Sequence, residues 1–337
     1  MGGKALNKYG VFTERKNTEE FLNLAKELQD NITLNLPVST AVVKCYHTKA
    51  NHGDLDLLLC MPNDVNINWR EYIQKHFNPQ AIHNNGGVFS FDYKNFQVDF
   101  IPIKEDKWEI AQIYYSYDPL GNIMGKTFHK FGLSYGWDGL HYKYRNFRGT
   151  NSANILLTTD PRKIFEFGGY DYDRYLKGFD TLEDIFKFVI KSENFDSEMF
   201  QMENLKSIDK KRNRKRGSYH LFLNYLKDNG IVVKKDFESD KSKYITPINF
   251  FFPEAKLKEK LEELNDKDRV DSYISQKFNG DIVMSWLPNL QGKELGAAIS
   301  KFKNHFASEA TFRTFVVDCD YETIRRNFMR IYHDENK

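Results

Sequence analysis

The stretch Gly53-Asp54-Leu55-Asp56-Leu57-Leu58-Leu59 places two carboxylates two positions apart in an otherwise apolar run. Side chains two apart on a β-strand share a face, so Asp54 and Asp56 point together while the alternating leucines point into a core. A third carboxylate, Asp99, lies in the middle of another apolar run, 96–101. Carboxylates on neighbouring strands repel unless cations hold them, and hard oxygen ligands on a rigid sheet suit two Mg²⁺ ions. The three aspartates are therefore predicted to form a two-Mg²⁺ site for phosphoryl transfer, in which Mn²⁺ can substitute.

These residues resemble the nucleotidyltransferase superfamily typified by DNA polymerase beta, and most closely its family X polymerases. The family pattern is an apolar strand, a glycine-containing turn, a short basic stretch and Gly-Asp-x-Asp, with a third acid on a later strand. Residues 42–49 and 53–56 are similar to the first part, and 98–102 to the third-acid strand. Residues 121–133 resemble the nucleotide-facing helix and its following turn, so the resemblance covers about residues 18–145.

The resemblance implies an α/β nucleotidyltransferase domain over 18–150, a polymerase beta-like palm with a twisted mixed sheet. The polar residues 1–17 are expected to form an N-terminal arm. Residues 151–337 are expected to form a mainly α-helical domain that binds nucleotide and nucleic acid. The implied reaction transfers a nucleoside monophosphate from an NTP or dNTP to the 3′ end of DNA or RNA, with release of pyrophosphate.

The resemblance also implies roles for individual residues. All three aspartates would bind metal, with Asp99 closest to the attacking 3′-hydroxyl and the candidate general base. Lys44 and Cys45 stand where the family has Gly-Ser, and His47 stands at a family arginine position. Lysine offers charge there but not the backbone freedom of glycine. The nucleotide-binding residues expected on this basis are Lys44, Cys45, His47, Lys49 and Asn122.

A dense run of basic residues occurs in a chain that is otherwise nearly neutral. The chain has 49 Lys and Arg against 47 Asp and Glu, yet seven cations fall within residues 206–216. Such a concentration favours contact with phosphates. A solvated helix end and a nuclear localisation signal are the alternatives. The residues expected to bind nucleic acid are Lys210, Lys211, Arg212, Arg214, Lys215 and Arg216.

Residues 287–299 contain a turn and helix start around Gly292. The segment resembles half of a helix-hairpin-helix, with Glu294 in place of the second glycine. It is also similar to the tail domain of tRNA nucleotidyltransferases and bacterial poly(A) polymerases. Backbone N–H groups at such a helix start can meet a phosphate, so Gly292 is a candidate nucleic-acid contact. The alternative is an ordinary loop entering a packed helix.

Local patterns predict several elements around the aspartates. Apolar periodicity predicts a helix that begins at Thr18 and another over 67–77. The runs 88–93 and 96–101, joined by Lys94-Asn95, predict a β-hairpin that brings Asp99 beside the other two acids. Further helix starts are expected at Asp160-Pro161 and Thr181.

Composition excludes several classes of protein. No apolar run of about 18 residues occurs, so no membrane span is expected. The three scattered cysteines predict neither disulfides nor a zinc site, which favours a cytoplasmic location, with a nuclear one left open. The alternative functions are nucleotidyl transfer to a small-molecule or protein acceptor, and a non-catalytic nucleic-acid-binding module. The pattern leaves the choice of DNA or RNA, template dependence and the oligomeric state open.

Overall fold

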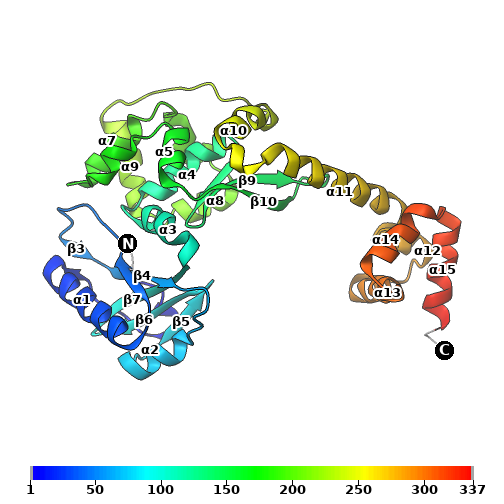
Figure 1. The fold of residues 1–337 in the computed structure, drawn as a ribbon, viewed down its shortest axis with the longest axis horizontal. Coiled ribbons are helices and arrows are strands. Elements are labelled where there is room, and N and C mark those ends of the chain that lie inside the picture. The colour runs from blue at the N-terminus through cyan, green and yellow to red at the C-terminus, as the bar shows by residue number, and fades with distance from the viewer. Residues whose placement is uncertain (1–2, 335–337) are drawn as a thin grey trace. The chain divides into compact units, whose positions relative to one another are not determined.

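The computed structural model describes residues 3–334 and divides into two compact units. Unit 1 contains the chain up to residue 143 together with 154–257. Unit 2 contains residues 144–153 together with 258 onward. Figure 1 shows the sheet-bearing part of unit 1 in blue and cyan, and the last helices of unit 2 in orange and red. Among the described residues, no helix combines the length and the apolar character needed to cross a bilayer.

A five-stranded mixed sheet carries the predicted acids. Its strand order is β2-β4-β7-β6-β5, with β4 and β7 parallel and the other neighbours antiparallel. The strands are β2 (Ser39–Val42), β4 (Asp54–Met61), β5 (Ile82–Asn85), β6 (Val88–Tyr93) and β7 (Phe96–Lys104). The predicted mixed sheet and the 88–101 hairpin are confirmed. The hairpin turns at Lys94 and Asn95, both at positive φ, because a tight two-residue turn between twisted strands requires it.

Helices cover both faces of this sheet. Leu55, Leu57 and Leu59 are fully buried in one cluster with residues of α1 (Thr18–Asn35) and α2 (Trp69–Phe77). On the other face, Leu58 and residues of β7 pack against α3 (Trp108–Tyr115). The alternation predicted for the acidic strand is therefore confirmed, since Leu55, Leu57 and Leu59, at alternate positions to the two aspartates, are part of the core.

The first helix begins at Thr18, as predicted, but its N-cap is the residue before it. Asn17, and not Thr18, is the N-cap residue, and its side chain accepts from the Glu20 N–H while the Glu20 carboxylate accepts from the Asn17 N–H. The Thr18 hydroxyl instead donates to the Lys49 carbonyl at 2.6 Å. Asparagine competes well for this position because its side-chain oxygen reaches the third helical N–H.

The segment before this helix packs onto the sheet domain. It contains a short 3₁₀ turn, η1 (Asn7–Tyr9), and strand β1 (Lys16–Asn17), which pairs with β3 (Asn51–His52). Leu6 is 1% exposed. Residues 3–17 are therefore part of unit 1, while residues 1–2 of the predicted arm lie outside the described residues.

The rest of unit 1 is mainly helical. Its helices include α4 (Leu120–Lys130), α5 (Pro161–Gly168), α6 (Tyr172–Leu176), α7 (Leu182–Ile190), α8 (Ser207–Asn213), α9 (Gly217–Asp228) and α10 (Ile245–Phe251). Strands β8 (Leu133–Gly136), β9 (Gly139–Arg145) and β10 (Asn151–Thr158) form a second sheet, whose β9–β10 turn belongs to unit 2. Six 3₁₀ turns are described in the chain, and the remaining five are η2 (Glu105–Lys107), η3 (Ser197–Phe200), η4 (Met202–Asn204), η5 (Lys241–Tyr244) and η6 (Pro253–Ala255). The caps predicted at Asp160-Pro161 and Thr181 are confirmed.

Unit 2 is built from α11 (Leu257–Lys277), α12 (Gly280–Trp286), α13 (Gly292–Asn304), α14 (Glu309–Asp318) and α15 (Tyr321–Asp334). Its core is aromatic, with Phe278, Phe302 and Phe328 buried together. We expected the two main domains, 18–150 and 151–337, to divide near residue 150. The compact units divide differently, because α4 packs against α5 and α7 and so keeps residues 154–257 with the sheet.

Candidate active site

The structure brings the three aspartates together. Asp54 and Asp56 lie on β4 and Asp99 lies on the adjacent parallel β7, where it is the register partner of Asp56. One carboxylate oxygen from each lies within 4.8 Å of those from the other two. A single cation could therefore contact all three side chains.

Burial and mutual repulsion act on these carboxyl groups. Burial raises the pKa of Asp56 well above its usual range, and the charges of Asp54 and Asp99 raise it further. Burial also raises the pKa of Asp54, and it raises the pKa of Asp99 to about 6 against hydrogen bonds from Ser90 and Gln97. Without a metal the cluster retains protons that a divalent cation would replace. An all-carboxylate oxygen set is also the donor set that Mg²⁺ and Mn²⁺ prefer, so these residues fit the predicted ions.

Asp54 and Asp56 line a cleft of about 870 Å³ within unit 1. The cationic residues that line the same cleft are Arg15, Lys44, Lys49, Arg212, Lys215 and Arg216. Asp118 is a further acidic residue of the lining. A cleft that places cations beside a divalent-metal donor set has the charge pattern needed for a polyphosphate ligand.

Four of the five predicted nucleotide-binding residues, Lys44, Cys45, Lys49 and Asn122, line this cleft. The fifth, His47, is not among its lining residues. The Nδ1 atom of His47 lies 2.7 Å from an Asp180 carboxylate oxygen, and its backbone N–H donates to the Phe179 carbonyl. The loop after Lys44 is thereby tied to the segment before α7, and His47 serves that contact in this structure.

The predicted nucleic-acid-binding cluster divides into two sets. The inner set, Arg212, Lys215 and Arg216, lines the cleft with Asp54 and Asp56. The outer set, Lys210, Lys211 and Arg214, is not among the lining residues. The Lys210 ammonium donates to the Glu203 carbonyl at 2.8 Å. One stretch of sequence thus presents cations both to the site and away from it.

Two polar contacts hold α8, which carries Arg212, against α4. The Lys126 ammonium lies 2.7 Å from a carboxylate oxygen of Asp209, with side-chain exposures of only 6% and 20%. The Asn122 amide donates to the Asn213 side-chain oxygen at 3.1 Å, and the buried Asn213 Nδ2 has no partner. These contacts position the inner set and also orient Asn122 in the cleft lining.

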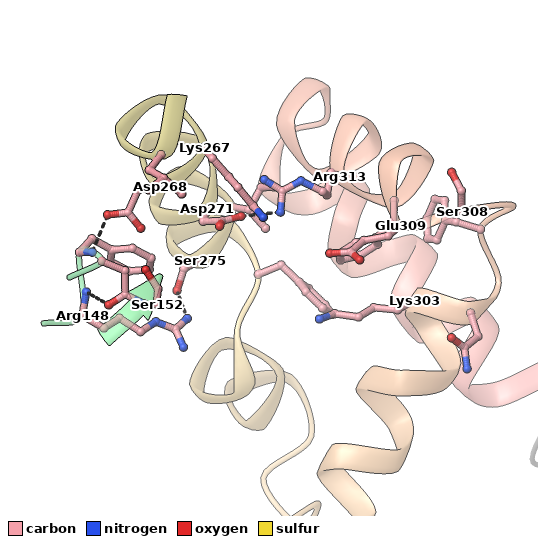
Figure 2. Close-up of a pocket in the computed structure, with 18 of the residues that line it drawn as sticks. Arg148, Ser152, Lys267, Asp268, Asp271, Ser275, Lys303, Ser308, Glu309 and Arg313 are labelled. Atoms are coloured by element: carbon pink, nitrogen blue, oxygen red, sulfur yellow. Dashed lines mark hydrogen bonds and ion pairs between the residues drawn. The ribbon is translucent and has the colours of Figure 1, made fainter. Parts of the chain in front are cut away.

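Gly292, the remaining predicted contact, lies in unit 2. It is the first residue of α13 and has φ +55, as the predicted turn glycine should. It does not line the 950 Å³ cavity of unit 2, which Figure 2 shows between the β9–β10 turn, α11 and α14. In that cavity Arg313 pairs with Asp271, and Arg148 donates to Ser275 at 3.1 Å. These charged groups already have protein partners.

Sequence reasoning missed several residues of the site. Arg15 lines the cleft although it lies in the predicted arm, and nothing in its local sequence indicates this. Lys126 could have been found, because it interrupts the apolar residues Ile123, Met124 and Phe128 of α4, all buried. A lone lysine among such residues needs a buried partner.

A search against models of known protein families finds no match, and no curated protein matches the chain. Among solved structures, the chain is similar to two ternary complexes of Leishmania infantum polymerase beta, a P/T complex and a gap complex. Both are 14% identical, with TM-scores of 0.38 and 0.37. The matches cover 49% and 47% of this chain, and 76% and 69% of those chains. A likeness of this size carries no functional argument, so the function has to be inferred from the residues of the cleft.

Proposed function

We propose that this protein is a nucleotidyltransferase that transfers a nucleoside monophosphate from an NTP or dNTP to the 3′ end of a nucleic acid and releases pyrophosphate. The observation that carries the proposal is the gathering of three aspartates on two adjacent strands beside a cleft lined by cations. A polyphosphate with its divalent cations needs both features in one place.

The metal ligands in this proposal are Asp54, Asp56 and Asp99. Two Mg²⁺ ions held there would lower the pKa of the attacking hydroxyl and neutralise charge on the triphosphate. Asp99 is the candidate acceptor of the hydroxyl proton.

The phosphate contacts in this proposal come from two directions in the sequence. Lys44, Cys45 and Lys49 lie between β2 and β4 of the sheet, and the inner set lies on α8 and just after it. Burial raises the pKa of the Cys45 thiol, so it remains a neutral thiol and not a nucleophile at neutral pH. The outer set and Gly292 are proposed to contact the nucleic-acid backbone.

The second candidate is transfer to a small-molecule or protein acceptor. The observation in its favour is the size of the cleft, because about 870 Å³ falls within the range of small-ligand sites, roughly 300–1,000 Å³. Salt dependence separates the two candidates. Binding of an oligonucleotide should weaken steeply with added salt, whereas binding of a small acceptor should not.

The test is extension of end-labelled oligonucleotides, offered as single strand, primer–template and tRNA, with Mg²⁺ and each NTP or dNTP. The blank is Asp54→Asn with Asp56→Asn, and the matched control is Asp64→Asn, an exposed aspartate just beyond β4. Extension in the wild type and control but not in the blank would support the proposal. Triphosphate binding without extension of any oligonucleotide would favour the second candidate.

A further inference from the structure

The segment that precedes the first helix reaches the proposed metal ligands directly. The backbone N–H of Gly3 donates to the Asp54 carboxylate at 3.2 Å. The N–H of Ala5 donates to the Gln97 side-chain oxygen at 2.9 Å, and the Gln97 Nε2 donates to Asp99 at 2.9 Å. Both contacts are made to residues that lie side by side in the sheet, since Asp54 and Gln97 are register partners on β4 and β7. The segment therefore spans the two strands that carry the acids.

From this geometry we propose that residues 3–6 are a positioning element of the metal site, which fixes the carboxylate orientations of Asp54 and Asp99 before any ion binds. The proposal rests on the proposed function of the aspartates as metal ligands. It gives a positioning role to an N-terminal segment for which the sequence indicates only polar character. The positioning residues are Gly3 and Gln97, and neither is proposed to touch an ion.

The Gln97 amide shows how a distant backbone group can set the orientation of a ligand. Gln97 is 2% exposed, so its amide has only these protein partners to choose between. Because the Ala5 N–H needs an acceptor, the amide oxygen must face Ala5, and the NH₂ group must then face Asp99. The reversed amide would place two oxygens against each other and leave the Ala5 N–H unpaired. Ala5 thus determines that Asp99 receives a donor.

Gly3 can make its contact because it has no side chain. Its φ is +82°, and an added Cβ would lie 2.2 Å from the Gly53 carbonyl oxygen. The Thr13 hydroxyl donates to the Gly3 carbonyl at 3.2 Å, and the buried Leu6 anchors the following turn. The Thr13 hydrogen bond and the buried Leu6 therefore hold the segment close to Gly53, the residue just before Asp54. A methyl group at position 3 must push the segment away from Asp54.

Gly10 is a matched control for Gly3. It has nearly the same backbone conformation, φ +77°, but an added Cβ would meet no atom within 4 Å. Gly3→Ala and Gly10→Ala therefore carry similar backbone strain and differ in the clash alone. Gln97→Met is the second variant, since it keeps the length of the side chain and removes both amide contacts.

The experiment measures Mn²⁺ binding to the full chain without nucleotide, by the electron paramagnetic resonance signal of free Mn²⁺, together with the Mg²⁺ dependence of activity. Loss of a group that orients a metal ligand costs about 10- to 100-fold in metal affinity. Gly3→Ala and Gln97→Met should each weaken Mn²⁺ binding by about tenfold, and added Mg²⁺ should restore part of the rate. Gly10→Ala should bind Mn²⁺ as the wild type does.

The outcomes separate this inference from the proposed function. If Asp56→Asn leaves Mn²⁺ binding unchanged, the aspartates are not the ligands and the proposed function fails with the inference. If Asp56→Asn abolishes binding but Gly3→Ala and Gln97→Met bind normally, the function stands and the inference is wrong. If Gly10→Ala weakens binding as much as Gly3→Ala, strain and not the contact is responsible, which also overturns it.

Discussion

Asp99 is a carboxyl group whose protonation should be visible in the stability of the metal-free protein. Its pKa in the folded protein is about 6, raised by burial, against about 3.9 in an unfolded chain. Between these values the native state holds more protons than the unfolded state, so this group lowers the free energy of unfolding as pH rises. This decrease in the free energy of unfolding is fully present above pH 6 and absent below about pH 4. Its upper limit is about 3 kcal/mol.

Two histidines act in the opposite sense over the same range. Burial lowers the pKa of His52 and of His129 to about 4, so the native state holds fewer protons than the unfolded state between about pH 4 and 6.5. The difference between Asp99→Asn and the wild type removes the contribution of the histidines and reports the Asp99 carboxyl group together with its effect on Asp56, whose pKa the Asp99 charge raises. In EDTA, Asp99→Asn should be the more stable protein at pH 8, and its advantage should vanish towards pH 4. Urea unfolding at several pH values measures this, and a difference independent of pH would contradict it.

At the scale of single residues, the sequence predicts whatever depends on local spacing. The same-face placement of Asp54 and Asp56 follows from the two-residue repeat of a strand, and the structure has it. The position of His47 depends on Asp180, which is 133 residues away in sequence. No local pattern contains that pairing, and the role of His47 in nucleotide binding stays a prediction.

Helix α8 depends on a buried ion pair for its place beside α4. Removing one partner of such a pair leaves an uncompensated buried charge, which typically costs about 3–5 kcal/mol. Asp209→Asn should therefore destabilise unit 1 by about 3 kcal/mol and weaken triphosphate binding, because Arg212 lies on the same helix. Urea unfolding and nucleotide titration measure the two effects.

The control for this change is Glu183→Gln, which removes the exposed Lys187–Glu183 pair of α7, where each side chain is 54% exposed. Pairs of this kind contribute about 0.5 kcal/mol or less. Lys126→Met with Asp209→Leu should recover most of the lost stability, since apolar groups of similar size can replace a buried pair. Equal losses of stability from Asp209→Asn and Glu183→Gln would show that the buried pair contributes no more to stability than the exposed pair.

The two halves of the basic cluster should differ in their contribution to nucleic-acid binding. Each phosphate contact to a single strand adds about 0.7 to the slope of log affinity against log salt. Replacing the outer set by alanine should reduce the slope by about two and leave triphosphate binding unchanged. Replacing the inner set should abolish triphosphate binding, because these residues are the proposed triphosphate contacts. Unchanged triphosphate binding after the inner replacement would remove these three cations from the proposed site.

Helix starts and turns were predictable where nearby side chains or turn residues satisfy the backbone groups. The Lys94-Asn95 turn, the Asp160-Pro161 start and the Thr181 cap all satisfy backbone groups within a few residues. The first helix shows the limit, since Asn17 and Thr18 are both good capping residues and periodicity alone does not choose between them. The N-terminal segment had no such signal, because its partners Asp54 and Gln97 lie on strands far along the chain.

At the scale of the whole molecule, the division of the chain was the least predictable feature. We expected a boundary near residue 150, but β10 (Asn151–Thr158) continues the second sheet beyond that point. Compactness follows packing, and the aromatic residues of α5 and α7, such as Phe165 and Phe188, pack together in unit 1. A helical segment that completes the core of a sheet domain has the same periodicity as one that forms its own domain.

The two compact units have separate hydrophobic cores, which gives a last prediction. Ile73 is fully buried in a core of unit 1, and Phe302 is 1% exposed in the core of unit 2. Replacing either by alanine leaves a cavity and should cost about 2–5 kcal/mol. Because the two clusters share no residue among those described, each loss should fall on one unit.

Scanning calorimetry of the full chain should resolve this as two transitions. Ile73→Ala should lower one midpoint and Phe302→Ala the other, and Mg²⁺ should raise only the transition that Ile73→Ala lowers, since the aspartates belong to unit 1. Leu34→Ala, at a side chain that is 85% exposed, is the control and should shift neither. A single transition that both core variants lower equally would mean that the units unfold as one cooperative body, and Mg²⁺ would then stabilise the whole chain together.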